Sequence, residues 1–330
     1  MYRHFLVPVG DIGSCIEAVG HAVAFAQSMG ARVTFMPILY QHAATHHHQD
    51  WHVQGTTGDA SRACNRAYNV RERALELLAR AEAAARAQGV PYSSIAASED
   101  TSFDGIVEAA VKSGCDLICV APGQRLGQAG DVVFAPSDGA GAGELPVLIC
   151  AADRRPAASR AIGVLLDKHR AIADTLHALL GMLRTARAAG QQPESISIRE
   201  AVSRLRDLQI GRHRLKQNAR FFSRLRERTS IADAELDELE CQHQRDEQLL
   251  DELTGLTKLV ERDPQPGVPV DRLEQALSVY AQFTWEYLGR EEGVVLPAAR
   301  RYLRDEDWND IATAFDATAA DSATVKPGHT

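Results

Sequence analysis

The fold of the C-terminal half is decided by the stretch Tyr287-Leu-Gly-Arg-Glu-Glu-Gly-Val-Val-Leu-Pro297, which Asp305-Glu-Asp-Trp308 follows closely. Side chains four residues apart lie on one face of a helix, so Tyr287 and Glu291 point the same way. This stretch, with its acidic pair Glu291 and Glu292, predicts the last helix of a metal-binding four-helix bundle. Tyr287 stands four residues before Glu291, where a metal-binding histidine is expected.

The rest of the C-terminal half shows helical periodicity throughout. Prolines at 193, 264, 266 and 269 separate the periodic segments, and long helices joined by short loops form antiparallel bundles. We therefore predict a bundle over residues 161–317 and a disordered tail over 318–330. The expected helices cover about 160–188, 199–228, 231–262 and 270–303, with a short helix near 307–316.

The N-terminal half, residues 1–152, alternates short apolar runs with helical patterns. Such alternation predicts an α/β domain, a doubly wound parallel sheet with helices on both faces. Glycines at 30, 89 and 114 mark the ends of the expected helices. The expected strands are 5–9, 32–39, 92–97, 117–121 and 146–150, and the expected helices are 18–30, 70–89 and 102–114.

Two segments of this half stand apart from the alternation. Residues 153–160 are polar and contain a proline, which predicts a linker between the domains. Residues 43–60 form an insertion that contains His46, His47 and His48. This insertion is either a solvated loop or a surface metal site, and histidines without a rigid scaffold bind metals weakly.

Composition narrows the class of protein. Hydrophobic residues make up 45% of the 330 residues and charged residues 24%, which is typical of a packed globular protein. The formal net charge is −8, so we expect no nucleic-acid partner. No apolar run reaches the ~18 residues of a spanning helix, and we expect a cytoplasmic protein with no membrane contact. The six cysteines form no CxxC pair, and free thiols are expected.

The N-terminal half resembles the universal stress protein family. The resemblance is carried by Phe5-Leu-Val-Pro-Val-Gly-Asp-Ile-Gly-Ser14, Ala31-Arg-Val-Thr-Phe35, Asp116-Leu-Ile-Cys-Val120 and Leu145-Pro-Val-Leu-Ile149. It spans about residues 1–152 and implies a doubly wound fold and a homodimer formed through the α/β domain. Some members of the family bind ATP.

The nucleotide motif of the ATP-binding members is only partly present. In those members, glycine backbone N–H groups approach the phosphates and a hydroxyl completes the cradle. Gly123 and Gly127 are the matching glycines here, and Asp11 stands near the matching position of the first loop. The Gly-Ser or Gly-Thr pair that should follow does not fall at the required spacing. We therefore expect a degenerate motif that does not bind ATP.

Residues 162–316 resemble the hemerythrin HHE cation-binding family, in which each helix projects ligands towards a di-iron site. Leu165-Leu-Asp-Lys-His169 matches its first helix and Glu240-Cys-Gln-His243 its third, with Glu247 one turn later. His213 matches the second helix and Glu291 the fourth. The resemblance implies that these histidines and acids surround one interior point.

The sequence departs from the family pattern at two ligand positions. Gln217 replaces a carboxylate, and Tyr287 replaces a histidine. A neutral amide is a poor iron ligand, and a phenol must lose its proton to bind a metal. The remaining set allows one Fe or Zn ion, or a metal-free polar core in which histidines and carboxylates pair with one another. His177 lies about 80° off the face of His169 and is expected at the periphery.

These patterns predict a non-enzymatic stress-response or sensory protein of the cytoplasm with degenerate metal and nucleotide sites. One alternative is an iron- or oxygen-sensing protein that uses the bundle site. Another is an ATP-binding stress-response switch. We further hypothesise that the ligand state of one domain alters its packing against the other through the linker.

Overall fold

The structure is a computed structural model. It describes residues 2–10, 13–38, 59–96, 102–121, 145–150, 155–218, 220–262 and 267–324. Most of the histidine-rich insertion, the candidate nucleotide residues Asp11, Gly123 and Gly127, and part of the linker lie outside these ranges. No helix within them is long and apolar enough to cross a lipid bilayer.

The N-terminal domain is built on a parallel sheet with the order β3-β2-β1-β4-β5 among the described strands. The central strand β1 pairs with β2 from His4↔Arg32 to Val9↔Pro37 and with β4 at Phe5↔Leu117. Apolar runs such as Phe5-Leu-Val are buried on both faces, as parallel sheets require. The strands are β1 (His4–Val9), β2 (Arg32–Pro37), β3 (Tyr92–Ser94), β4 (Leu117–Val120) and β5 (Val147–Ile149).

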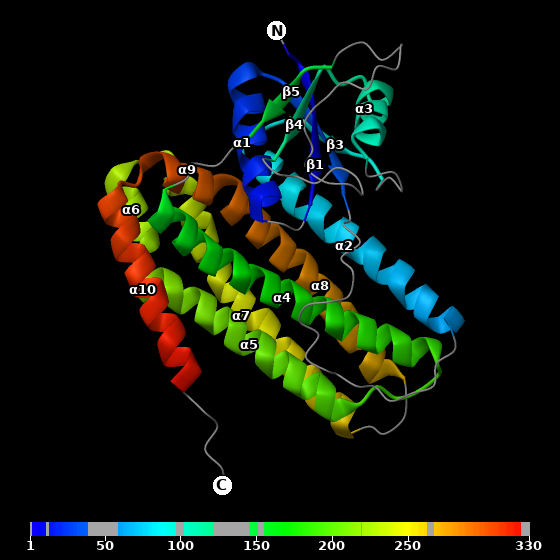
Figure 1. The fold of residues 1–330 in the computed structure, drawn as a ribbon. Coiled ribbons are helices and arrows are strands. Elements are labelled where there is room, and N and C mark those ends of the chain that lie inside the picture. The colour runs from blue at the N-terminus through cyan, green and yellow to red at the C-terminus, as the bar shows by residue number, and fades with distance from the viewer. Residues whose placement is uncertain are drawn as a thin grey trace.

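Helices cover both faces of this sheet (Figure 1), so the predicted doubly wound fold is confirmed. Helices α1 (Gly13–Met29) and α2 (Asp59–Ala87) share one apolar core with the sheet. Helix α3 (Phe103–Lys112) packs on the opposite face through Ile106 and Ala110. The hydroxyl of Ser102 accepts a hydrogen bond from the Gly105 N–H and caps α3, as serine does at helix starts.

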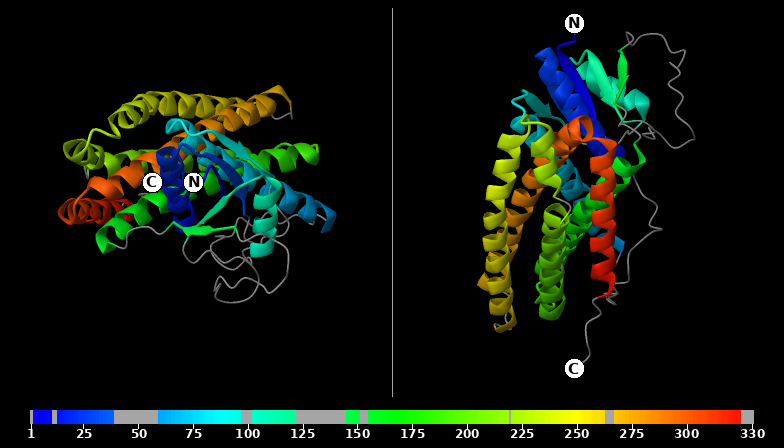
Figure 2. Two further views of the ribbon diagram at one scale, coloured as in Figure 1. Left: turned by 90° about the horizontal axis from the view of Figure 1, so that it is seen from above. Right: turned by 90° about the vertical axis from the view of Figure 1, so that its left-hand side faces the viewer.

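The C-terminal half is the predicted antiparallel helical bundle (Figures 1 and 2). One continuous apolar core joins its long helices, each of which buries an apolar face. Its elements are α4 (Pro156–Ala188), α5 (Ser195–Asn218), α6 (Phe221–Arg228), α7 (Asp233–Arg262), α8 (Val268–Arg290), the π-helix η1 (Glu291–Val295), α9 (Leu296–Tyr302) and α10 (Asp305–Thr324).

Helix α2 belongs to both halves. It covers the sheet with its C-terminal part and continues along α4 and α8 of the bundle (Figure 1). Two glycines permit a close approach of the backbones. A Cβ added at Gly289 would lie 2.6 Å from the Arg80 Cα, and one added at Gly293 would collide with Ala84. The stretch that predicted the bundle is therefore also the surface on which the α/β domain packs.

The structure differs from the predicted helix limits at several places, and α4, which begins at Pro156, takes in part of the predicted linker. Helix α2 begins at Asp59 rather than near 70, and it contacts α4 and α8 of the bundle as well as the strands of its own domain. The predicted second helix of the bundle is split near Arg220, which has a positive φ of 50°, and Phe221 beyond it is buried beside Trp308. Helix α10 continues to Thr324, into the predicted tail.

Candidate functional site

The centre of the site is His169 on α4, which faces two glutamates of η1. Its Nδ1 lies 2.7 Å from the Glu292 Oε1, and its Nε2 lies 3.5 Å from the Glu291 Oε2. All three side chains are buried. A π turn begins at Glu291 and contains both glutamates, and π turns are frequent at functional sites.

Glu292 also receives a guanidinium from the other domain. Arg80 of α2 donates from Nε to Oε2 at 3.0 Å and from Nη2 to Oε1 at 2.5 Å. Both side chains are buried. Burial raises the pKa of Glu292, but the Arg80 charge and the His169 hydrogen bond outweigh it and hold that pKa below its usual value. The two domains thus meet in a bidentate, desolvated ion pair, the strongest geometry for such a pair.

The ion pair continues along α2 to Glu76. Arg80 Nη1 donates to this carboxylate at 2.7 Å, and the His177 Nε2 lies 2.7 Å from its other oxygen. Although burial raises the pKa of Glu76, the His177 hydrogen bond and the charges of Arg80 and Arg73 bring it to about 2. His177 is not peripheral as predicted, because α2 covers this face of α4. It is half-buried and stacks on Trp285 with ring centroids 5.5 Å apart.

A second buried guanidinium lies inside the bundle. Arg212 of α5 sits 4.2 Å from the ring centroid of Tyr287, and its Nη2 lies 3.6 Å from the Asp246 Oδ2. Burial lowers the pKa of this guanidinium, whereas Tyr287, Asp246 and Glu291 raise it above the usual value. Arg212 therefore places a permanent positive charge against the position where a metal-binding histidine was expected.

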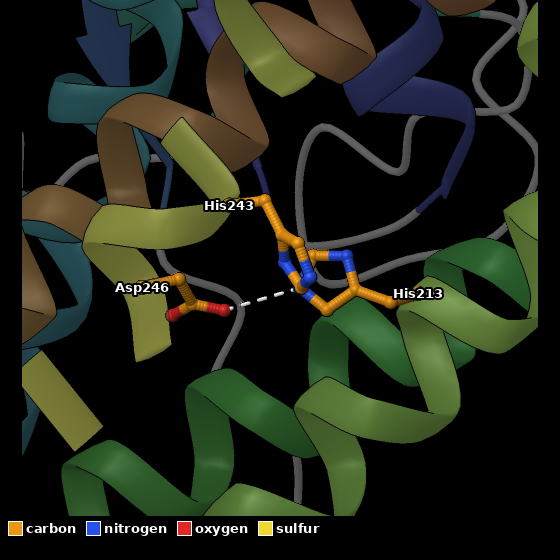
Figure 3. Close-up of side chains that lie close together, drawn as sticks. All are labelled: His213, His243 and Asp246. Atoms are coloured by element: carbon orange, nitrogen blue, oxygen red, sulfur yellow. Dashed lines mark hydrogen bonds and ion pairs between the residues drawn. The ribbon is translucent and has the colours of Figure 1, made fainter. Parts of the chain in front are cut away.

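A third group joins α5 to α7. The His213 Nε2 lies 3.2 Å from the Asp246 Oδ2 and 3.0 Å from the His243 Nδ1 (Figure 3). Asp246 is buried, whereas the His243 side chain is 35% exposed. Burial raises the pKa of Asp246, but the His213 hydrogen bond and the Arg212 charge lower it below its usual value. Among the described residues, these three side chains each bring one possible metal-ligand atom to within 4.8 Å of the others.

The structure thus divides the predicted ligands between two groups. His169 and Glu291 lie together, and His213 and His243 lie together. Arg212 interacts with both groups: its Nη2 lies 3.6 Å from the Asp246 Oδ2, and the charges of Asp246 and Glu291 both raise its pKa. The predicted ligand Glu247 is 66% exposed, with its Oε1 3.6 Å from the His243 Nε2. The Gln217 side chain lies outside the described residues.

Sequence reasoning missed several members of these groups. Asp246 follows His243 by three residues, and that helical spacing alone was enough to place the two on one face. Glu292 belongs to the acidic pair of the Tyr287–Pro297 stretch, but only Glu291 was taken as a ligand. Arg80 and Glu76 lie in the α/β domain, and a comparison confined to the bundle gives no signal for them. Arg212 adjoins His213 and has no counterpart in the expected ligand pattern.

Fold and site together define a two-domain protein, in which a doubly wound α/β domain packs on a four-helix bundle with buried histidines and carboxylates. The model of the Universal stress protein family matches residues 1–134. The model of the Hemerythrin HHE cation binding domain matches residues 160–299. The chain is therefore a fusion of a universal-stress-protein-like domain with a hemerythrin HHE-like domain, as the sequence predicted.

One similar solved structure is the crystal structure of a protein from the universal stress protein family from Burkholderia pseudomallei. It is 19% identical and covers 36% of this chain and 81% of that chain, with a TM-score of 0.28. No curated protein matches the chain.

The residues around His169 do not fit the pair of metal ions that a hemerythrin-like bundle implies. Arg80 engages both oxygens of Glu292, and Arg212 lies near Glu291 and Tyr287. Two unit charges 4 Å apart interact by about 4 kcal/mol at an effective dielectric constant of about 20. Metal dications at this centre would meet repulsion from both guanidiniums. The arginines supply the positive charge that balances the buried carboxylates.

Proposed function

We propose that the chain is a non-enzymatic stress-response protein of the cytoplasm. In this proposal the bundle senses the state of the universal-stress-protein-like domain through buried ion pairs rather than through a metal pair. One observation carries the proposal: Arg80 of the α/β domain, Glu292 of η1 and His169 of α4 form one buried chain of hydrogen bonds.

The energetics of buried charge support such coupling. Removing one partner of a buried ion pair costs about 3–5 kcal/mol, because the other charge is left uncompensated. Any movement of α2 that withdraws Arg80 leaves the Glu292 charge uncompensated. His169 is hydrogen-bonded to the same carboxylate. A ligand that shifts α2 by binding the α/β domain therefore changes the free energy of the bundle. The route that we propose runs from α2 to η1, whereas the hypothesis from sequence ran through the linker.

Hydrogen exchange tests this coupling. We expect Arg80→Met to speed amide exchange by about 100-fold in η1 and in the α4 turn around His169, because the Glu292 charge loses its partner. The matched control is Arg86→Met, which removes an arginine that joins α2 to α8 through the exposed Glu286. Faster exchange confined to α2 in Arg80→Met would show that the bundle does not respond.

We also propose that the chain forms a homodimer through the α/β domain. In support, β5 is an edge strand of the described sheet, and its Leu148 and Ile149 are exposed. Such edges pair readily with other strands. In sedimentation velocity we expect the full chain to run as a dimer and Ile149→Lys as a single 35.9 kDa chain. Val111→Lys, at an exposed site on α3, is the control, and a wild-type monomer would contradict the proposal.

A further inference from the structure

The group formed by His213, His243 and Asp246 has a chemistry separate from that of the arginine-filled centre. We propose that these three side chains bind one divalent transition-metal ion of the zinc class at the rim of the bundle. Two helices supply the ligands: α5 carries His213, and α7 carries His243 and Asp246 three residues apart (Figure 3). His169 and Glu291 take no part in this site.

The hydrogen bonding of His213 is the first reason. Its Nε2 lies within hydrogen-bond distance of both the Asp246 Oδ2 and the His243 Nδ1. A ring nitrogen is either a donor or an acceptor, so it cannot donate to Asp246 and accept from His243 at once. Without a cation, the best arrangement shares the proton of the His213 Nε2 between two acceptors, the Asp246 Oδ2 and the His243 Nδ1. A metal ion at the centre accepts lone pairs from all three atoms together.

The spacing of the three atoms is the second reason. Zinc binds imidazole nitrogen at about 2.0–2.1 Å, which puts neighbouring ligands of a tetrahedral ion about 3.3 Å apart. The two distances around the His213 Nε2 are 3.0 and 3.2 Å, and all three ligand atoms lie within 4.8 Å of one another. A small adjustment of side chains therefore completes three corners of a tetrahedron. Since the His243 side chain is 35% exposed, water reaches the fourth.

Surrounding side chains hold the ligands in place, as outer partners do in metal sites. The Tyr280 hydroxyl donates to the Asp246 Oδ1 at 2.8 Å, which leaves Oδ2 to face the histidines. The Gln209 Nε2 lies 3.4 Å from the same Oδ1. On the outer side, the Glu247 Oε1 lies 3.6 Å from the His243 Nε2, the arrangement of a carboxylate behind a metal-binding imidazole.

Arg212 limits the number of metal ions that the site can hold. Its Nη2 lies 3.6 Å from the Asp246 Oδ2, on the side of the bundle centre. A cation placed between Asp246 and the histidines lies at the rim and shares this carboxylate with Arg212. A second ion towards the centre would meet the guanidinium directly. The site therefore takes one ion and not two.

Zinc binding to the full chain tests the site. The background is a His46→Ala, His47→Ala, His48→Ala variant, which removes the imidazoles of the insertion as competitors. Competition with a chromophoric chelator should give one tight Zn²⁺ per chain, and Co²⁺ should give the visible absorption of a four-coordinate ion. We expect His243→Ala to weaken binding by about 100-fold or more, and Tyr280→Phe by about 10-fold, since it touches an outer partner.

The control variant is His169→Gln, which alters the bundle centre and leaves the three proposed ligands in place. Retention of tight binding in His169→Gln, with its loss in a folded His243→Ala, supports the site; circular dichroism checks the fold of each variant. If His169→Gln abolishes binding while His243→Ala does not, the metal lies at the bundle centre. The absence of a tight Zn²⁺ in the parent would show that the three side chains form only a hydrogen-bonded cluster. Either of these two results overturns the proposal, while the α2–η1 coupling is tested separately by hydrogen exchange.

Discussion

Replacing Gly289 by alanine is expected to cost the full chain about 3 kcal/mol or more of unfolding free energy. The added Cβ would lie 2.6 Å from the Arg80 Cα and 2.8 Å from its carbonyl carbon. These are backbone atoms, so no side-chain rotation relieves the collision. Helices α2 and α8 must separate, and the same separation pulls Arg80 away from Glu292. The cost combines overpacking with a broken buried ion pair.

Gly255→Ala is the matched control. Gly255 lies in the exposed middle of α7, and nothing approaches within 4 Å of its added Cβ. Since alanine is the better helix former, this variant should be more stable than the parent by up to about 1 kcal/mol. Urea unfolding followed by circular dichroism compares the two. Equal stabilities of Gly289→Ala and Gly255→Ala would mean that α2 does not pack against α8 as described.

The close packing of α2 explains why the Tyr287–Pro297 stretch contains two glycines. Gly289 and Gly293 lie one turn apart, and both face α2. Of the acids between them, Glu291 faces His169, and Glu292 contacts both Arg80 of α2 and His169 of α4. A single short segment therefore provides both the close packing surface for α2 and the carboxylate that joins the two domains. A change in the position of α2 therefore changes the contact between Arg80 and Glu292 directly.

Much of the architecture could be predicted from sequence because it depends on local periodicity. Apolar residues repeat at helical spacing through α4, α7 and α8, and the N-terminal half alternates strands with helices. The positions of His169 and Glu291 in the bundle interior also follow from spacing, since each lies on the apolar face of its helix.

The ion pairs could not be predicted in the same way. Arg80 and Glu292 are 212 residues apart along the chain and lie in different domains. No periodicity links them, and their contact depends on how the two domains pack. Glu292 also lies in a π turn that begins at Glu291. Neither feature has a signature in a single sequence.

Buried arginines can supply the positive charge that a metal ion would otherwise provide. A bundle whose interior holds carboxylates needs buried positive charge, whether from a metal or from a guanidinium. Arg80 and Arg212 provide it without dependence on metal supply, and both pKa values are raised above the usual value despite burial. One of the two, Arg80, belongs to the other domain. The bundle therefore depends on that domain for part of its charge balance.

A double-mutant cycle between Arg80 and Glu292 tests this central claim most directly. The free energies of unfolding would be measured for the parent, Arg80→Met, Glu292→Gln and the double variant. Arg80→Met should lose about 3–5 kcal/mol, because it leaves the buried Glu292 without its guanidinium, and Glu292→Gln should lose less, because Arg80 keeps Glu76 as a partner. The double variant should lose far less than the sum, with a coupling energy of about 3 kcal/mol.

The exposed pair Arg86–Glu286 joins the same two helices and serves as the matched cycle. Its coupling energy should be no more than about 1 kcal/mol, as for other exposed pairs. If the Arg80–Glu292 cycle gives a coupling several times that of Arg86–Glu286, the α/β domain supplies charge to the bundle interior. Additive losses at Arg80 and Glu292, with a coupling near zero, would contradict the account.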